Sequence, residues 1–205
     1  INFGSNAGLR MEDVIKDADP DYLVVQGDTT TTFTCALAGF YHKVPVVHIE
    51  AGLRTGDIYS PFPEEGNRKI VSAFAKFFFP PTEVSAENLR KEGITENVIV
   101  TGNTSIDSLR MTMDKIKEAG LDQKLLDKYP FMNSDKKLIL VTTHRRENHG
   151  EPLDNICKAI LKLSENKELQ FVIPVHLNPN VKDVIHTYFD DIENVHLLKP
   201  LDYVD

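Results

Sequence analysis

Short apolar runs that alternate with helix-like segments are the feature of this chain that most limits its fold. In the first half, the apolar runs lie at residues 21–28, 44–52, 77–82 and 97–103. Segments with helical spacing stand before and between them, at residues 11–19, 29–43, 63–77 and 85–93. Strands that alternate with helices favour a mostly parallel sheet with helices on both faces. We therefore predict an α/β domain of the Rossmann-like type over residues 1–103.

The alternation stops at residue 104 and restarts at residue 136. The stretch between, residues 104–135, has the pattern of a long polar helix with further polar segments, and we interpret it as a connector. The later apolar runs lie at residues 136–144, 169–176 and 194–201, with helix-like segments at 151–166 and 180–189. This pattern predicts a second Rossmann-like domain over residues 136–205. Because the chain starts without methionine and stops just after an apolar run, we expect both domains to be incomplete.

Composition limits the class of protein and its partners. Of the 205 residues, 41% are hydrophobic and 26% are charged, which is ordinary for a globular protein. The chain has no apolar run of about 18 residues, so we expect no membrane span. The net charge of −8 argues against a nucleic-acid partner, which needs clustered Lys and Arg. Cys35 and Cys157 stand far apart in helix-like segments, which predicts two separate thiols in a reducing cytoplasm.

Polar side chains stand where several apolar runs stop. Asp28 and Glu50 end the first two runs, and His144 and His176 end two runs of the second half. Ligands of open α/β sheets gather at the carboxyl ends of the strands, so these residues are candidates for a site. A cleft between two such units could combine acid–base groups from one side with a cation for a phosphate from the other.

Each candidate carboxylate also has a structural interpretation. Asp28 precedes four threonines and could cap the helix that follows it. Glu50, at the end of a buried run, would need a partner, and Arg54 stands four residues later. Glu64 and Glu65 stand in the first turn of a predicted helix, where acidic side chains interact favourably with the helix dipole.

The segment HRREN places His144, Arg145 and Arg146 at a predicted strand-to-helix turn. Imidazole and guanidinium groups can hold a phosphate, although a solvated basic loop explains them equally well. His176 is a weaker candidate, and we assign the other histidines to the surface or to packing. The seven histidines lack the close spacing of metal ligands, so we predict no metal site.

Five segments, in their order and spacing, resemble one family: GDTTTT, HIEAGLRTG, SPFPEEGNR, TGNTSIDSL and THRREN. They resemble the non-hydrolysing UDP-N-acetylglucosamine 2-epimerases over nearly the whole chain. The SPFPEE run favours this branch, because the hydrolysing relatives usually lack it. The resemblance implies the GT-B fold, with two Rossmann-like domains and no cofactor. It also implies interconversion of UDP-N-acetylglucosamine and UDP-N-acetylmannosamine, by elimination and re-addition of UDP through 2-acetamidoglucal.

The resemblance further implies roles for individual residues. Asp28, Glu50 and Glu64 match the acid–base carboxylates of the family, without an assignment of base and acid, and His144 matches the histidine that assists the diphosphate. The remaining substrate-binding candidates are the cationic residues near these positions: Arg54, Arg68, Arg145, Arg146 and His176. Arg145 or Arg146 would bind the anionic substrate or a second UDP-N-acetylglucosamine that acts as an activator. The resemblance also suggests a homodimer.

Two other functions stay open at the level of sequence. A GT-B glycosyltransferase shares the fold and a nucleotide-sugar ligand, but it needs an acceptor and does not require three carboxylates around C2. A catalytically inactive sugar-nucleotide-binding fragment would keep the motifs without turnover. An acceptor-independent product excludes the first alternative, and hydrogen exchange at C2 excludes the second.

Overall fold

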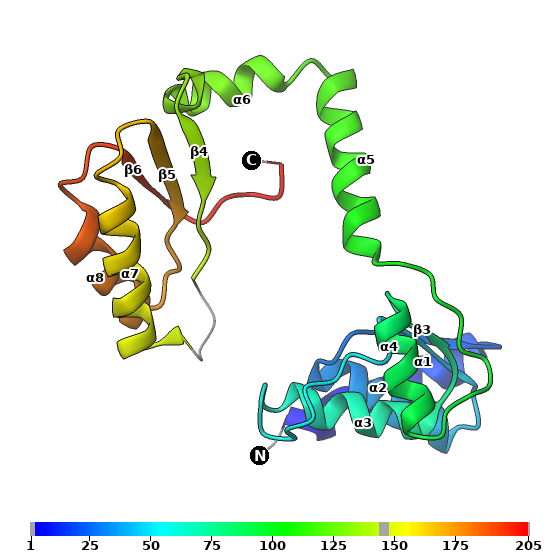
Figure 1. Cartoon of the computed structure of the whole chain (residues 1–205). Coiled ribbons are helices and arrows are strands. Elements are labelled where there is room, and N and C mark those ends of the chain that lie inside the picture. Colours follow the sequence, from blue (N-terminus) through cyan, green and yellow to red (C-terminus); the bar gives the residue numbers. More distant parts are fainter. Residues whose placement is uncertain (1–2, 144–147, 205) are drawn as a thin grey trace. The chain divides into compact units, whose positions relative to one another are not determined.

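The computed structural model describes the backbone of residues 3–143 and 148–204, and the side chains of residues 10–143 and 148–204 (Figure 1). The chain divides into two compact units, Ile1–Ser108 and Leu109–Asp205. Each unit contains its own three-stranded sheet and its own hydrophobic core.

The first unit is built on a parallel sheet. Its strands, in order across the sheet, are β1 (Leu23–Gln26), β2 (Val46–Ile49) and β3 (Ala75–Phe79). Gln26 lies opposite Ile49, and Ile49 lies opposite Phe79, so the three strands end at the same level. The residues that follow β1 and β2 therefore meet at one edge of the sheet.

Four helices accompany these strands: α1 (Phe3–Ala18), α2 (Thr30–Tyr41), α3 (Glu64–Phe74) and α4 (Glu83–Lys91). Two of them begin at threonine caps, because Thr29 accepts a hydrogen bond from the Thr32 N–H and Thr82 accepts one from the Ser85 N–H, both at 3.2 Å. The cap of α2 is therefore Thr29, and the alternative that Asp28 caps this helix is wrong.

The strand predicted at residues 97–103 does not form. This segment forms one isolated parallel bridge with β3, between Phe78 and Val98. The Phe78 N–H donates to the carbonyl of Asn97, and the N–H groups of Ile99 and Thr101 donate to the carbonyls of Phe78 and Pro80. Pro80 has no N–H to continue this ladder, so no second bridge follows. β3 also starts two residues earlier than predicted, because α3 already ends at Phe74.

Two groups of buried side chains hold the first unit together. The larger group lies between the sheet and α1, α2 and α3 and contains Ile15, Leu23, Val25, Ala36, Ala38, Val46 and Val71. The smaller group joins Ala51, Phe78 and Leu89, so it fixes the loop after β2 against α4. Apolar burial of this kind is the main stabilising term of such a domain.

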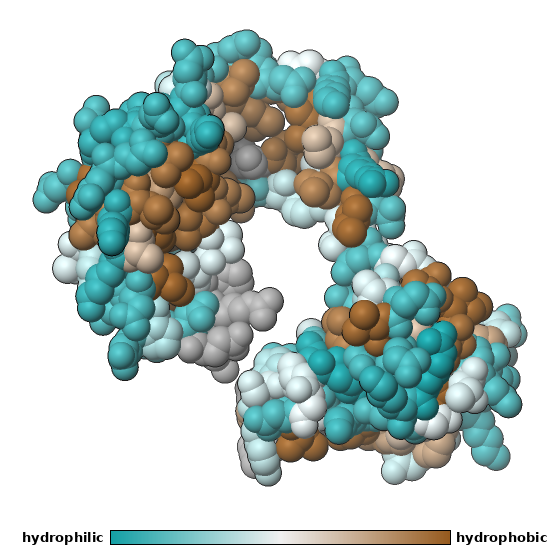
Figure 2. Space-filling view, viewed as in Figure 1, coloured by the Kyte–Doolittle hydropathy of each residue, from teal (hydrophilic) through white to brown (hydrophobic). Residues whose placement is uncertain are grey.

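The segment predicted as a connector is helical in most of its length. It contains α5 (Thr104–Glu118), α6 (Asp122–Lys128) and a short 3-10 helix (Pro130–Asn133). α5 buries none of its residues. Ile106, Leu109 and Met113 are each about half exposed and give α5 an apolar surface (Figure 2).

The second unit repeats the parallel arrangement. Its strands, again in order across the sheet, are β4 (Lys137–Leu140), β5 (Leu169–Pro174) and β6 (Val195–Leu198), and its helices are α7 (Glu151–Leu163) and α8 (Pro179–Phe189). Leu153 and Cys157 of α7 pack with Phe171 of β5 and with Ile185 and Phe189 of α8. All five of these side chains are fully or almost fully buried.

These two units confirm the predicted fold class, α/β with two Rossmann-like domains of GT-B type. Each sheet is entirely parallel, as the alternation of apolar runs and helical segments predicts. None of the helices in the described part of the chain is both long enough and apolar enough to cross a membrane.

Candidate functional site

Asp28 and Glu50 meet at the carboxyl edge of the first sheet. Asp28 stands two residues after β1 and Glu50 directly after β2. The Gly27 N–H donates to the carbonyl of Ile49 at 3.0 Å, which ties the two strand ends together. A Cβ atom placed on Gly27 would lie 3.5 Å from Oε2 of Glu50. The Glu50 carboxylate therefore lies beside Gly27, the residue that precedes Asp28 in the chain.

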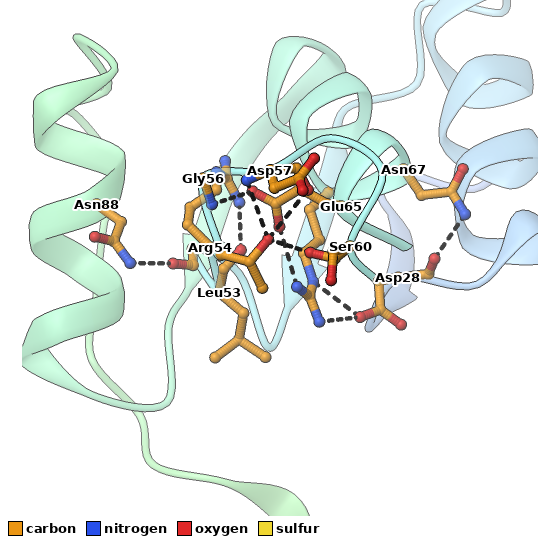
Figure 3. Close-up of polar contacts among 12 residues, drawn as sticks. Asp28, Leu53, Arg54, Gly56, Asp57, Ser60, Glu65, Asn67 and Asn88 are labelled. Atoms are coloured by element: carbon orange, nitrogen blue, oxygen red, sulfur yellow. Dashed lines mark hydrogen bonds and ion pairs between the residues drawn. The ribbon is translucent and has the colours of Figure 1, made fainter. Parts of the chain in front are cut away.

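The start of α3 is bound to Asp28 through two of its residues (Figure 3). The Arg68 guanidinium donates to Oδ2 of Asp28 from Nε at 2.9 Å and forms an ion pair with the same oxygen through Nη2 at 2.7 Å. The Asn67 side-chain amide donates to the backbone carbonyl of Asp28 at 2.7 Å. Side chain and backbone of Asp28 are thus both held by the first two turns of α3.

Glu64 and Glu65 occupy the first turn of α3 but have different surroundings. Oε2 of Glu64 is buried and has no hydrogen-bond partner among the described residues. The Glu65 side chain is completely buried and accepts hydrogen bonds from the Gly56 N–H at 3.2 Å and from Nη1 of Arg68 at 3.1 Å. An unpartnered buried carboxylate oxygen is unusual and marks Glu64, rather than Glu65, as the candidate for proton transfer.

Hydrogen bonds keep Glu65 ionised despite its burial. Burial alone would raise the pKa of Glu65, but hydrogen bonds from Arg68 and from the backbone of Thr55 and Gly56 outweigh it, so the pKa lies below its usual range. Glu65 is thus a fixed negative charge beneath the site. Its position in the helix is predicted by the sequence, whereas its burial is not.

Glu50 has a strained backbone. Its φ is 65°, in the left-handed region that residues with a side chain rarely adopt. The Glu50 N–H donates to the carbonyl of Phe79 at 3.0 Å, which fixes this turn against β3. Backbone strain of this kind is concentrated at functional sites, where it aims a side chain. The half-buried Glu50 carboxylate forms no ion pair within the described residues.

Arg54, which the sequence offers as a partner for Glu50 four residues before it, binds Glu92 instead. Its side chain is 8% exposed, and Nε and Nη2 form a double hydrogen bond with Glu92 at 2.8 and 2.6 Å. Nη2 also donates to Ser72 of α3 at 2.9 Å. A hydrogen bond from Arg54 is the main reason why the pKa of Glu92 lies below its usual range. Arg54 therefore joins the loop after β2 to α3 and α4.

His48 contributes to the site, although the sequence assigns it to packing. It is 1% exposed, and Nε2 donates to the carbonyl of Gly27 at 2.9 Å. Burial lowers the pKa of His48 below its usual range, against the opposite effect of the hydrogen bond to Gly27, so the ring is neutral at pH 7. This hydrogen bond fixes the backbone of Gly27, which precedes Asp28, to the strand that precedes Glu50. Its place in β2, two residues before Glu50, is the only sequence signal for this role.

Of the candidates in the second half, only His176 lies in the described part of the chain. It is exposed, two residues after β5, and its Nδ1 accepts a hydrogen bond from the Asn178 N–H at 3.1 Å. His144, Arg145 and Arg146 lie outside the described residues. Among the described residues, no group of three or more His, Cys, Asp and Glu side chains could hold a metal ion.

Comparison with known proteins identifies the family. The family profile described as UDP-N-acetylglucosamine 2-epimerase matches residues 5–205. The UDP-N-acetylglucosamine 2-epimerases of Neisseria meningitidis and Bacillus subtilis are 48% and 47% identical to this chain, over 95% and 98% of its length and 53% and 51% of theirs. The crystal structure of the Neisseria meningitidis UDP-GlcNAc 2-epimerase bound to UDP-GlcNAc superimposes with a TM-score of 0.93 at 47% identity, and the match covers 98% of this chain and 55% of that one.

The chain thus spans about half the length of the curated relatives it matches. Asp28, Glu50 and Glu64 all belong to the first unit, and the profile match includes them. Because this match takes in almost every residue, the chain belongs to the UDP-N-acetylglucosamine 2-epimerase family.

Proposed function

We propose that the protein to which this chain belongs interconverts UDP-N-acetylglucosamine and UDP-N-acetylmannosamine by inverting C2, without hydrolysis. Membership of the family supports the substrate class, and a relative that is 47% identical was solved with UDP-GlcNAc bound. The observation that supports the proposal is the edge of the first sheet, where Glu50 lies beside Gly27 and where Asn67 and Arg68 of α3, the helix that Glu64 begins, bind Asp28. Inversion at carbon needs acid–base groups around the reacting atom, and this edge supplies three.

The proposed reaction is an elimination followed by an addition. The proton at C2 is not acidic, because no carbonyl in the ring adjoins it. A carboxylate removes this proton, and the electron pair of the broken C2–H bond forms the C1–C2 double bond. The C1–O bond breaks at the same time, and its electron pair leaves with UDP, which leaves 2-acetamidoglucal. UDP then adds back at C1 while a proton arrives at the other face of C2. Neither step changes an oxidation state overall, and both need only proton transfer and a clamp on the departing diphosphate.

The environments of the three carboxylates favour different roles. Asp28 has a guanidinium partner and two fixed contacts with α3, which suits a group that must stay in place through both steps. Glu64 has a buried oxygen without a partner, and Glu50 is half-buried on a strained turn. All three carboxylates are candidates for moving the proton at C2. We propose that His144, Arg145, Arg146 and His176 bind the diphosphate side of the ligand, as the family resemblance implies.

The proposal extends to partners and location. A second UDP-N-acetylglucosamine would act as an activator through Arg145, and the whole protein would form a homodimer, as in the resembling family. Cys35 and Cys157 are both free thiols, which fits the reducing cytoplasm.

Proton NMR of UDP-N-acetylglucosamine in D2O tests the proposal directly. The samples are the 205-residue chain and a version extended at both ends, to the length of the relatives, with the corresponding segments of the Neisseria meningitidis enzyme. The proposal predicts loss of the C2 proton signal and a UDP-linked manno product without an acceptor. Free N-acetylmannosamine as the product would contradict the non-hydrolysing assignment. Absence of exchange and product from both samples would contradict the epimerase assignment.

A further inference from the structure

Glu65 is a buried charge that the proposed chemistry does not use. Its side chain is 0% exposed, although it neighbours the candidate acid–base residue Glu64. An ionised carboxylate in a protein interior is destabilising unless its hydrogen bonds compensate, and an apolar residue of similar size often packs there at no cost in stability. The presence of a charge at this position therefore calls for a role other than packing.

The contacts of Glu65 lead to Asp28 through a single side chain. Arg68 donates to Glu65 from Nη1 at 3.1 Å, while its Nε and Nη2 contact Oδ2 of Asp28 at 2.9 and 2.7 Å. The three nitrogens of one guanidinium are thus divided between two carboxylates. Because the guanidinium is planar and rigid, fixing Nη1 also fixes the direction of the opposite edge.

Glu65 also fixes the loop before α3. Oε1 accepts the N–H of Gly56 at 3.2 Å, so the carboxylate contacts the loop with one oxygen and Arg68 with the other. The Arg68 side chain is 14% exposed and Asp28 is 25% exposed, whereas Glu65 is fully buried. The chain of contacts therefore runs from the buried carboxylate of Glu65 to the solvent-accessible edge where a substrate would bind.

We propose that Glu65 is a positioning residue, which acts on Asp28 only through Arg68. It holds the guanidinium in the one orientation that presents Nε and Nη2 to the Asp28 carboxylate, and it ties the loop at Gly56 to the same frame. The predicted effect of Glu65 on turnover rests on the proposed function. The geometric part of the inference, the orientation of Arg68, does not depend on any activity.

The kinetic test uses Glu65→Gln in the extended protein. Glutamine keeps the shape and the acceptor for Gly56, but its neutral amide no longer anchors Arg68. We expect kcat to fall about 10- to 100-fold with KM nearly unchanged, as for a misplaced reacting group. In an Arg68→Met background the same substitution should change kcat by less than about twofold, because its route to Asp28 is already lost.

Glu92→Gln is the matched control. It also removes a carboxylate that binds an arginine in the same unit, but its partner is Arg54 and not Arg68. In the double variant with Arg68→Met, the fold-changes in kcat of the two substitutions should multiply, because Glu92 does not act through Arg68. Unchanged kcat in a folded Glu65→Gln protein, or an equal loss in the Arg68→Met background, would overturn the proposal.

A second readout separates this inference from the proposed function. The readout is the Arg68 Nε–H signal in 1H–15N spectra of the 205-residue chain, which is identified by its loss in Arg68→Met. In Glu65→Gln this signal should move or lose its protection from hydrogen exchange. In Glu92→Gln it should stay in place. An unchanged signal in Glu65→Gln overturns the positioning role whether or not the protein exchanges C2. If Glu65→Gln fails to fold, Glu65→Asp replaces it, and wild-type kcat together with an unmoved Nε–H signal in that variant would likewise overturn the proposal.

Discussion

Gly52 lies where the loop after β2 passes closest to α4. Its φ is 83°, and a Cβ atom at this position would lie 2.2 Å from the carbonyl oxygen of Ser85. The Asn88 side chain donates to the Gly52 carbonyl at 3.0 Å from the same helix. We expect Gly52→Ala to lower the free energy of unfolding by about 3 kcal/mol, because the cost of a left-handed backbone at alanine adds to the cost of the clash with the backbone of Ser85. Urea denaturation of the 205-residue chain measures this difference.

Gly93 provides the control for Gly52. Its φ of 84° is nearly the same, but a Cβ atom there would meet nothing within 4 Å. Gly93→Ala should therefore show the conformational penalty alone, about 1 kcal/mol. Equal losses in both variants would mean that the contact with α4 adds nothing.

His48 predicts how stability depends on pH. Its pKa in the folded state is lowered by burial, so the unfolded chain, with a pKa near about 6.5, binds the proton more readily. The free energy of unfolding should therefore decrease as the pH falls from about 7 to about 5. His48→Gln, whose amide can also donate to the Gly27 carbonyl, should make this decrease shallower in urea titrations at several pH values. His186→Gln, at a partly exposed position of α8 where the ring pairs with Asp190, serves as the control, and an equally shallower decrease in that variant would contradict this assignment.

At the scale of single residues, the sequence predicts which polar side chains end the strands. It does not predict which residues form hydrogen bonds or ion pairs with them. Asp28 and Glu50 follow from their places at strand ends, whereas Glu64 is singled out from Glu65 only by the family resemblance. The partner of Arg54 does not, because Glu92 lies 38 residues away in the chain and only the packing of α4 brings it close. The burial of Glu65 depends in the same way on how the loop at Gly56 folds back.

At the scale of elements, α7 buries a thiol completely. Cys157 is 0% exposed, and burial, assisted by Asp154, raises its pKa to about 11. A thiol reacts as the thiolate, so Cys157 should resist alkylation in the native state at about pH 8 and react only on unfolding. Mass spectrometry after brief iodoacetamide treatment, with and without urea, measures this directly. Cys35 is only half-buried, so the ratio of native to denatured labelling should be lower for Cys157 than for Cys35.

The elements also show where pattern reasoning stops. Helical spacing and apolar runs predict α2, α3, α4, α7 and α8 and all six strands within a few residues. They fail at residues 97–103, where the apolar run predicts a buried strand but Ile99 and Val100 are exposed. The N–H groups of Ile99 and Thr101 bond to Phe78 and Pro80, but Pro80 has no N–H to return a bond, so the pairing stays an isolated bridge.

At the scale of the whole molecule, alternation of strands and helices is sufficient to predict two parallel sheets. Each sheet has its own core, and the first sheet brings Asp28 and Glu50 to one edge from segments that are far apart in the chain. The net charge of −8 is compatible with an anionic ligand only where cations are placed locally, and Arg68 is already shared between Asp28 and Glu65. The cations HRR of the second unit are predicted from the sequence and lie outside the described residues.

The central claim is that the three carboxylates at the edge of the first sheet move the proton at C2. The most direct test is the rate of deuterium incorporation at C2 of UDP-N-acetylglucosamine in D2O, for the extended protein and for its Asp28→Asn, Glu50→Gln and Glu64→Gln variants. We expect rapid incorporation in the parent and a loss of about 100-fold or more in each variant, with folding unchanged. Incorporation at the parent rate in all three variants would contradict the account.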